Sequence, residues 1–280
     1  MIWLTKLQCD VPLPTSKNPK VLVVRLITDR KQYCIKELID TSKSLTYKNH
    51  KVIHIDNSAD DFLKESLEDV GLSVVKTEHF MKDANGKYIY NTEAKEDKEK
   101  KKRKVLPVRE MMIRDMNLAR DIVLGQDYDY MLILEQDIIP HPDIIEKLLS
   151  YKQHIMSAFY WLDMKPLVHE GRAGWWTPVN YYVFKTTKDG DVIQNTMFEP
   201  NPKEVFFPSG PFPYAHAGFG CTLVSREVLK KVKFRYDPER VAQVDAFFCM
   251  DSIKAGFIPM VTTEIIVGHL HEDWDATTKV

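Results

Sequence analysis

Short, mainly apolar runs alternate with segments of helical periodicity along the first half of the chain. The apolar runs cover residues 20–27, 52–56, 72–76 and 131–134. Such runs are typical of strands buried on both faces of a parallel sheet. The helical segments cover residues 32–43, 60–70 and 107–124. This alternation predicts an α/β fold, in which a Rossmann-like, mostly parallel sheet is flanked by helices and joined by right-handed crossovers.

The second half of the chain keeps this pattern less regularly. Residues 154–160 are another strand candidate, whereas residues 161–215 are rich in aromatic residues, proline and glycine and are expected to form irregular hairpins and loops. A glycine-containing turn, a strand and a helix are expected within residues 215–229. Residues 242–256 have the pattern of an amphipathic helix that ends at Gly256.

Composition narrows the class of protein. With 280 residues the chain can bury a large core, and we expect a single domain over residues 1–280. The formal net charge of −1 argues against a nucleic-acid-binding protein, which usually has a strong basic excess. The spacing of the four cysteines predicts neither a zinc site nor a disulfide framework. A cytoplasmic location is expected, because the sequence shows neither a secretion signal nor an apolar run of about 20 residues.

One segment is strongly charged. Residues 93–104 consist almost entirely of charged side chains and end in a lysine-rich run. We interpret this run as a solvated segment. The alternative is a basic patch that contacts phosphate or an anionic membrane surface, which leaves a peripheral membrane contact open.

The candidate chemistry starts from two carboxylates. Glu135 and Asp137 directly follow the apolar run 131–134, and Pro140 prevents the strand from continuing. Open α/β sheets bind ligands at the carboxyl ends of their strands. Two carboxylates at this spacing can face one hard cation, Mn²⁺ or Mg²⁺, whose remaining ligands are phosphate oxygens. Alternatively, both are solvated turn residues without a role.

Further candidates are spread over the chain. Asp245 lies near the start of a predicted helix, and His269 ends an apolar run. Gly218 and Gly220 allow a close approach of the backbone, although they lack the strand–GxGxxG–helix context of a nucleotide-binding loop. Arg109 and Arg114 lie on the segment 107–124, where they can either neutralise phosphate or pair on the helix surface.

In their order and spacing, these segments resemble the inverting GT-A glycosyltransferases of family 2. The resemblance runs from about residue 20 to residue 272, and the strings that carry it are 132–149, 218–229 and 244–269. The chain departs from the family pattern in three ways. Glu135 opens the DXD-like motif, Val244 stands where the family usually has an acid, and the turn after the first strand lacks the usual Pro-Thr.

The resemblance implies roles for individual residues. Asp56 is implied to hydrogen-bond the nucleobase of a nucleotide-sugar donor. Asp137 is implied to bind a divalent cation, and Glu135 to contact ribose or the metal. Asp245 corresponds to the catalytic base, and His269 to a late metal ligand or phosphate contact.

The resemblance also divides the domain into a nucleotide-sugar-binding half, 20–150, and an acceptor-binding and catalytic half, 151–280. Trp175 and Trp176, within the aromatic stretch 159–184, are expected to bind the acceptor, because aromatic rings suit a flat ligand such as a sugar. An aromatic mini-core is the structural alternative. The sequence does not indicate whether the acceptor is a glycan, a lipid-linked molecule or a protein.

The sequence thus predicts a metal-dependent glycosyltransferase that moves a sugar to an acceptor hydroxyl with inversion. Three alternatives stay open: a retaining enzyme on the same scaffold, a nucleotidyltransferase, and a non-catalytic sugar- or nucleotide-binding module. A nucleotidyltransferase normally has a glycine-rich, basic loop after the first strand, and residues 28–31 contain no glycine.

Overall fold

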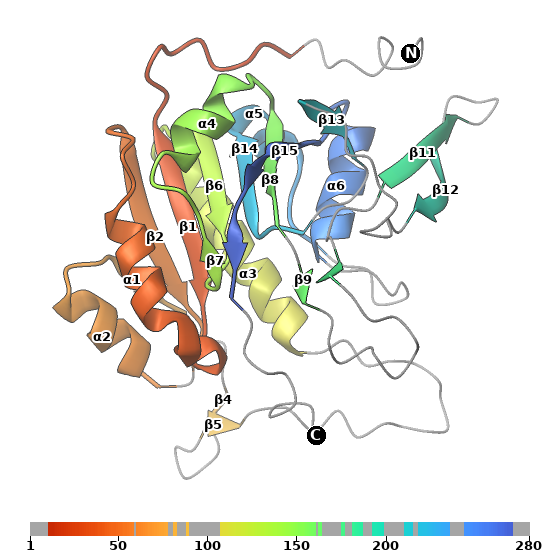
Figure 1. Ribbon diagram of the computed structural model, residues 1–280. Coiled ribbons are helices and arrows are strands. Elements are labelled where there is room, and N and C mark those ends of the chain that lie inside the picture. The colour runs from red at the N-terminus through yellow and green to blue at the C-terminus, as the bar shows by residue number, and fades with distance from the viewer. Residues whose placement is uncertain are drawn as a thin grey trace, which may run out of the picture.

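The computed structural model describes most of the sheet and the helices around it. The described residues are 11–58, 60–77, 81–82, 88–89, 107–160, 162–163, 175–176, 181–186, 192–198, 210–214, 218–235 and 244–270. Their centre is an eight-stranded sheet (Figure 1). From one edge to the other, its strands are β3 (Val74–Lys76), β2 (His50–Asp56), β1 (Val21–Ile27), β6 (Tyr130–Leu134), β14 (Cys221–Ser225), β8 (Ile155–Phe159), β15 (Met260–Ile266) and β13 (Pro211–Pro213).

The sheet is mostly parallel, as the sequence predicts. β1 runs parallel to β2 and β6, β2 runs parallel to β3, and β15 runs parallel to β8. β14 is antiparallel to both of its neighbours, and β13 is antiparallel to β15. The carboxyl ends of β1, β2 and β6 therefore meet at one edge of the sheet.

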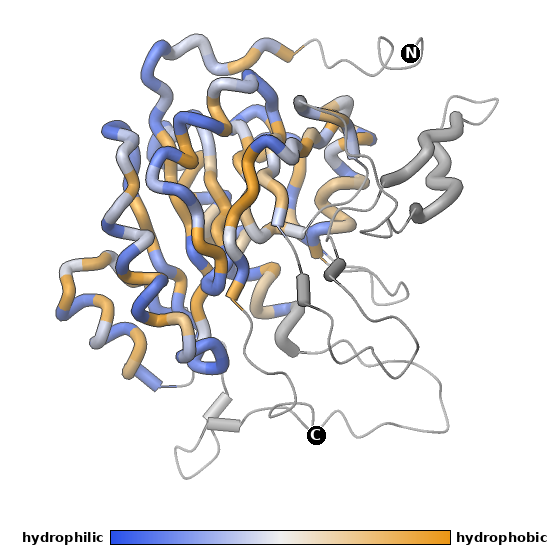
Figure 2. Tube along the Cα trace, viewed as in Figure 1, coloured by the Kyte–Doolittle hydropathy of each residue, from blue (hydrophilic) through white to orange (hydrophobic). Residues whose placement is uncertain are grey.

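Helices cover both faces of this sheet. One face carries α3 (Pro107–Gly125), α5 (Arg226–Lys231) and α6 (Val244–Lys254), which share a buried cluster with Leu22 and Val24 of β1. On the other face, α4 (Ile144–Ser150) packs against Val21 and Val23, while α1 (Ile35–Lys43) and α2 (Phe62–Asp69) pack around Ile27. Figure 2 shows how hydrophobic residues concentrate along the central strands between these helices.

The alternation along β1 places one charged side chain on a buried face. Residues at odd positions of this strand face α1 and α4, because side chains alternate along a strand. Arg25 occupies such a position and is fully buried. The fold therefore encloses a guanidinium between the sheet and α1.

Several shorter elements complete the described structure. The 3₁₀ helix η2 (Asp29–Cys34) links β1 to α1. β7 (Ile138–Ile139) pairs antiparallel with β16 (Gly268–His269). The remaining pairs are β4 (Met81–Lys82) with β5 (Tyr88–Ile89), β9 (Leu162–Asp163) with β10 (Trp175–Trp176), and β11 (Tyr181–Thr186) with β12 (Val192–Phe198).

Helix α6 differs from its prediction in one respect. It ends before Gly256, which adopts a φ of 88°, so the predicted stop signal is confirmed. However, the four consecutive residues 246–249 are all buried. Four consecutive helical positions span most of the helix circumference, so α6 is enclosed on several sides and is not an amphipathic surface helix.

The described helices do not include a membrane span, since none combines the length and the apolar composition that crossing a bilayer requires. The charged segment 93–104 lies outside the described residues.

A close contact between Gly220 and Tyr160 predicts a stability effect. A Cβ atom at Gly220 would lie 2.5 Å from two ring atoms of Tyr160, which is itself buried. Gly220→Ala should therefore lower the free energy of unfolding, measured by urea denaturation, by about 1–3 kcal/mol through overpacking. Gly125→Ala is the matched control, because nothing lies within 4 Å of its Cβ position; it should leave stability equal or raise it by up to about 1 kcal/mol. Equal stabilities of the two variants would contradict the predicted clash.

Candidate active site

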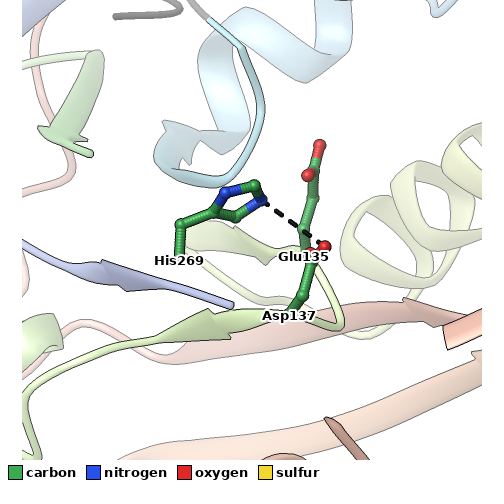
Figure 3. A group of neighbouring side chains, drawn as sticks. All are labelled: Glu135, Asp137 and His269. Carbon is green, nitrogen blue, oxygen red and sulfur yellow. Dashed lines mark ion pairs between the residues drawn. The ribbon is translucent and has the colours of Figure 1, made fainter. Parts of the chain in front are cut away.

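The candidate site lies where β6 ends. Glu135, Gln136 and Asp137 form the turn between β6 and β7. The pairing of β7 with β16 sets His269 opposite Ile138, the residue next to Asp137. A short two-strand ladder thus brings together residues that are more than 130 positions apart in the chain, as Figure 3 shows.

Three side chains of this site form a group that can hold a metal ion. One ligand atom from each of Glu135, Asp137 and His269 lies within 4.8 Å of the others. The Nε2 atom of His269 is 3.4 Å from Oδ2 of Asp137, whose side chain is only 5% exposed. Two carboxylates and one imidazole are a donor set that suits Mn²⁺ or a related divalent ion.

Asp137 also has partners from the 3₁₀ helix η2. The ammonium of Lys31 lies 2.9 Å from Oδ1 and 2.8 Å from Oδ2 of Asp137. The hydroxyl of Tyr33 donates a hydrogen bond to Oδ2 at 3.1 Å. Burial disfavours the charge of Asp137, but the hydrogen bond from His269 and the charge of Lys31 hold its pKa well below the ordinary value. Asp137 is therefore ionised at neutral pH.

Glu135 has a different electrostatic environment. Burial raises the pKa of its carboxyl group, and the negative charge of Asp137 raises it further. The charge of Lys31 acts in the opposite direction. The site thus combines a strongly ionised carboxylate with one that takes up a proton more easily.

A buried arginine supports the turn from the protein interior. Nη2 of Arg25 donates hydrogen bonds to the backbone carbonyls of Glu135, Gln136 and Ile138, at 3.2, 3.4 and 2.9 Å. Its Nη1 donates to the hydroxyl of Thr41 at 2.7 Å, on α1. Although burial lowers the pKa of Arg25 to about 10, the guanidinium stays charged at neutral pH.

The middle residue of the turn ties it to the loop after β1. Oε1 of Gln136 accepts a hydrogen bond from the N–H of Thr28 at 2.8 Å. Its Nε2 donates to the carbonyl of Lys31 at 3.0 Å. Gln136 therefore fixes the turn relative to η2, which carries Lys31 and Tyr33.

Asp245 approaches the same group from α6. It lies in the first turn of this helix and is partly exposed, and its Oδ1 accepts a hydrogen bond from the N–H of Ala246 at 2.7 Å. The charge of Asp245 contributes to the raised pKa of Glu135 and of Tyr160, so the three groups lie within electrostatic range of one another.

Tyr160 joins the candidate metal ligands to the glycine segment. Its ring lies 5.4 Å from the ring of His269, centroid to centroid. Its hydroxyl accepts a hydrogen bond from the N–H of Gly220 at 3.2 Å. Gly218 is buried, and the close approach predicted for this glycine segment is found at Gly220.

Asp56 lies at the carboxyl end of β2, opposite Ile27 at the end of β1. Its side chain is fully buried. Oδ2 pairs with the ammonium of Lys76 at 2.9 Å, and Oδ1 accepts a hydrogen bond from the N–H of Ser58 at 2.8 Å. Asp56 thus shares the edge of the sheet with the turn, and both of its oxygens have partners within the chain.

The structure describes the remaining predicted site residues, two arginines and two tryptophans, only in part. Arg114 is exposed on α3. Arg109 lies on α3 and Trp175 and Trp176 form β10, but their side chains lie outside the described part of the structure. The acceptor-binding role predicted for the aromatic stretch therefore stays a prediction.

Sequence reasoning missed the residues that support the turn. Arg25 carried a detectable signal, because a charged residue in the middle of a buried strand requires polar partners. In the sequence, Lys31 belongs to the loop after the first strand and Tyr33 to the predicted helix 32–43, and neither pattern indicates a contact with Asp137. Their contact with Asp137 depends on the irregular backbone of η2, where Lys31 itself departs from helical dihedral angles.

No protein-family model matches the sequence, and no curated protein is significantly similar to it. Solved structures do share its fold. One is the mannosyltransferase PcManGT from Pyrobaculum calidifontis in complex with GDP-Man and Mn²⁺, with a TM-score of 0.51 and 14% identity over 97% of this chain. Another is GalNAc-T7 with UDP, GalNAc and Mn²⁺, with a TM-score of 0.56 and 11% identity over 92% of this chain. The present chain spans 62% and 45% of those two chains. The likeness shows that the chain has a GT-A-like fold.

The support of the turn by Arg25 predicts that lysine cannot replace it. Lysine keeps the charge but lacks the planar fork that reaches two α1 hydroxyls and three turn carbonyls at once. Arg25→Lys should lower the free energy of unfolding, measured by urea denaturation, by about 1–3 kcal/mol. Arg235→Lys, at an exposed ion pair with Asp251, is the control and should cost less than about 1 kcal/mol. A loss at Arg25 no larger than in the control would show that the turn does not depend on the guanidinium.

Proposed function

We propose that this protein is a metal-dependent glycosyltransferase that moves a sugar from a nucleotide-sugar donor to an acceptor hydroxyl, with inversion by direct displacement. One observation carries the proposal. Glu135, Asp137 and His269 converge at the carboxyl edge of a GT-A-like sheet, where open α/β sheets bind their ligands. The two solved structures named above contain Mn²⁺ and a nucleotide or nucleotide sugar, which supports the same ligand class here.

The donor side of the proposed site is the half of the chain over residues 20–150. Glu135 and Asp137, with His269 from β16, would hold a Mn²⁺ or Mg²⁺ ion. A divalent cation bound there supplies positive charge to the diphosphate leaving group. Asp56 is the proposed contact of the nucleobase, a role that requires its carboxylate to exchange at least one of its present partners, Lys76 or the N–H of Ser58.

The proposed catalytic base is Asp245. In a direct displacement, the acceptor oxygen bonds to the anomeric carbon while the bond from that carbon to the diphosphate oxygen breaks. The acceptor hydroxyl loses its proton to the base at the same time. Asp245 places a carboxylate in the first turn of α6, and a positioned carboxylate can receive this proton.

The acceptor side would be formed by residues 151–280. α6 brings Asp245 into electrostatic range of Glu135, as a base between donor and acceptor requires. We propose that Trp175 and Trp176 contribute to the acceptor surface. Arg109 or Arg114 would add positive charge near the diphosphate.

Donor binding can be tested by thermal stabilisation. Mn²⁺ together with one member of a panel of UDP-, GDP- and dTDP-sugars should raise the melting temperature, because a ligand at a hundredfold excess over its Kd stabilises the folded state by about 2.7 kcal/mol. EDTA should abolish the effect, and Asp137→Asn should lose the part that depends on Mn²⁺. Asp143→Asn, at a more exposed carboxylate that pairs with Lys147 on α4, is the matched control. The proposal fails if no sugar nucleotide stabilises the protein in the presence of Mn²⁺.

Catalysis is tested separately at Asp245. Asp245→Asn should keep donor affinity but reduce the rate of sugar transfer at least about a hundredfold, the usual contribution of a positioned base. Transfer from a radiolabelled donor measures the rate, and thermal stabilisation measures donor binding. Asp251→Asn removes a carboxylate from the same helix, where it pairs with Arg235, and should keep near-normal transfer. Near-normal turnover of Asp245→Asn would exclude this residue as the base.

A further inference from the structure

The ammonium of Lys31 forms an ion pair with Asp137. Its Nζ lies almost equally far from both carboxylate oxygens, at 2.9 and 2.8 Å. The Lys31 side chain is 34% exposed, whereas that of Asp137 is 5% exposed. The lysine therefore reaches the buried carboxylate from the solvent side of the site.

We propose that Lys31 is an exchangeable counter-ion, which leaves Asp137 when a divalent cation binds and then pairs with the diphosphate of the donor. The inference rests on the proposed function, and it assigns to Lys31 a donor-binding role that depends on the metal. It also predicts that the metal and the nucleotide assist each other in binding through this one side chain.

Lys31 and the proposed metal ion would contact the same oxygen atom of Asp137. A divalent cation lies about 2.1 Å from an oxygen that ligates it. Since Lys31 Nζ is 2.8 Å from Oδ2 of Asp137, a cation on the same oxygen would lie at most about 5 Å from the ammonium. Repulsion between these charges is strong in a partly buried site, so binding of the metal disfavours the present position of Lys31.

The remaining partners of Asp137 make the exchange feasible. With a divalent cation in place of Lys31, this carboxylate has the cation as its counter-charge and keeps the hydroxyl of Tyr33, which donates to Oδ2 at 3.1 Å. The departure of the lysine therefore does not leave a buried charge without partners. A fixed structural ion pair would instead need Lys31 as a permanent counter-charge.

The position of Lys31 indicates where its ammonium goes. Lys31 lies in η2, shortly after the carboxyl end of β1, and its own backbone dihedral angles are not helical. A lysine side chain is a flexible stem with a compact charge, which can turn from one anion to a neighbouring one. The proposed diphosphate is the anion that would share the metal with Asp137.

The exchange has a thermodynamic consequence. A nucleoside diphosphate that draws Lys31 away from Asp137 removes a competitor of the metal, and by linkage the metal strengthens binding of the nucleotide to the same extent. Removing the lysine should therefore raise the affinity for the metal in the absence of nucleotide and lower the affinity for the nucleotide in the presence of metal.

Lys31→Met separates this role from a structural one. Without nucleotide, the variant should bind Mn²⁺ about tenfold more tightly than the wild type, measured by the loss of the free-ion electron paramagnetic resonance signal. In saturating Mn²⁺, it should bind UDP or GDP, whichever the wild type prefers, about tenfold more weakly, measured by calorimetry. Lys230→Met is the control, because it removes an exposed lysine that pairs with Glu227 on α5, and it should change neither affinity.

The outcomes distinguish the inference from the proposed function. If Lys31→Met binds Mn²⁺ no more tightly than the wild type, the inference is overturned, even where both proteins bind the donor. If Mn²⁺ binds only to the variant, Lys31 is a fixed counter-ion that the metal does not displace, and both the exchange and metal-dependent transfer by the wild type are overturned. If neither protein binds Mn²⁺, both proposals fail.

A measurement on the wild type does not depend on the variant. Amine acetylation followed by mass spectrometry reports how accessible each lysine is. Mg²⁺ alone should increase the acetylation of Lys31 about twofold or more, because metal binding and release of the lysine are coupled. The acetylation of Lys230 should stay unchanged. Unchanged labelling of Lys31 at a Mg²⁺ concentration that saturates the protein would overturn the exchange.

Discussion

The guanidinium of Arg25, buried between the sheet and α1, anchors the turn on which the whole site depends. It donates hydrogen bonds to three backbone carbonyls of that turn, so the turn is shaped by contacts to its main chain, not to its carboxylates. The carboxylates of Glu135 and Asp137 are therefore left to face each other and His269. A buried charge is costly unless it has hydrogen-bond partners, and both terminal nitrogens of Arg25 have them, in the hydroxyls of α1 and in the backbone carbonyls of the turn.

The two carboxylates of this turn are two residues apart but have opposite tendencies. Positive groups around Asp137 keep it ionised, whereas burial and neighbouring negative charge make Glu135 easier to protonate. Such a separation limits the repulsion between two acids in one site. The arrangement suits the proposed binding of a cation together with a polyanion. Asp137 stays ionised, whereas the protonation of Glu135 depends on the charges around it.

Periodicity was sufficient to predict the central strands, most helices and the position of Glu135 and Asp137, because these follow from local hydrophobic pattern and from the rule for open α/β sheets. It did not predict the buried faces of α6, which depend on elements distant in sequence. The neighbourhood of Asp137 and His269 rests on the two-residue pair of β7 and β16, too short to leave a pattern. The contact with Lys31 rests on irregular backbone, for which single-residue preferences carry little information.

The pairing of β16 with β7 also has a consequence for how the protein is made. Chains emerge from the ribosome with the N-terminal part first, so Arg25, Lys31 and the acidic turn can assemble long before residue 269 has been synthesised. A nascent chain that has reached only α6 holds the carboxylates without the imidazole. The group of proposed metal ligands would thus be complete only after residue 269 has been synthesised and β16 has paired with β7.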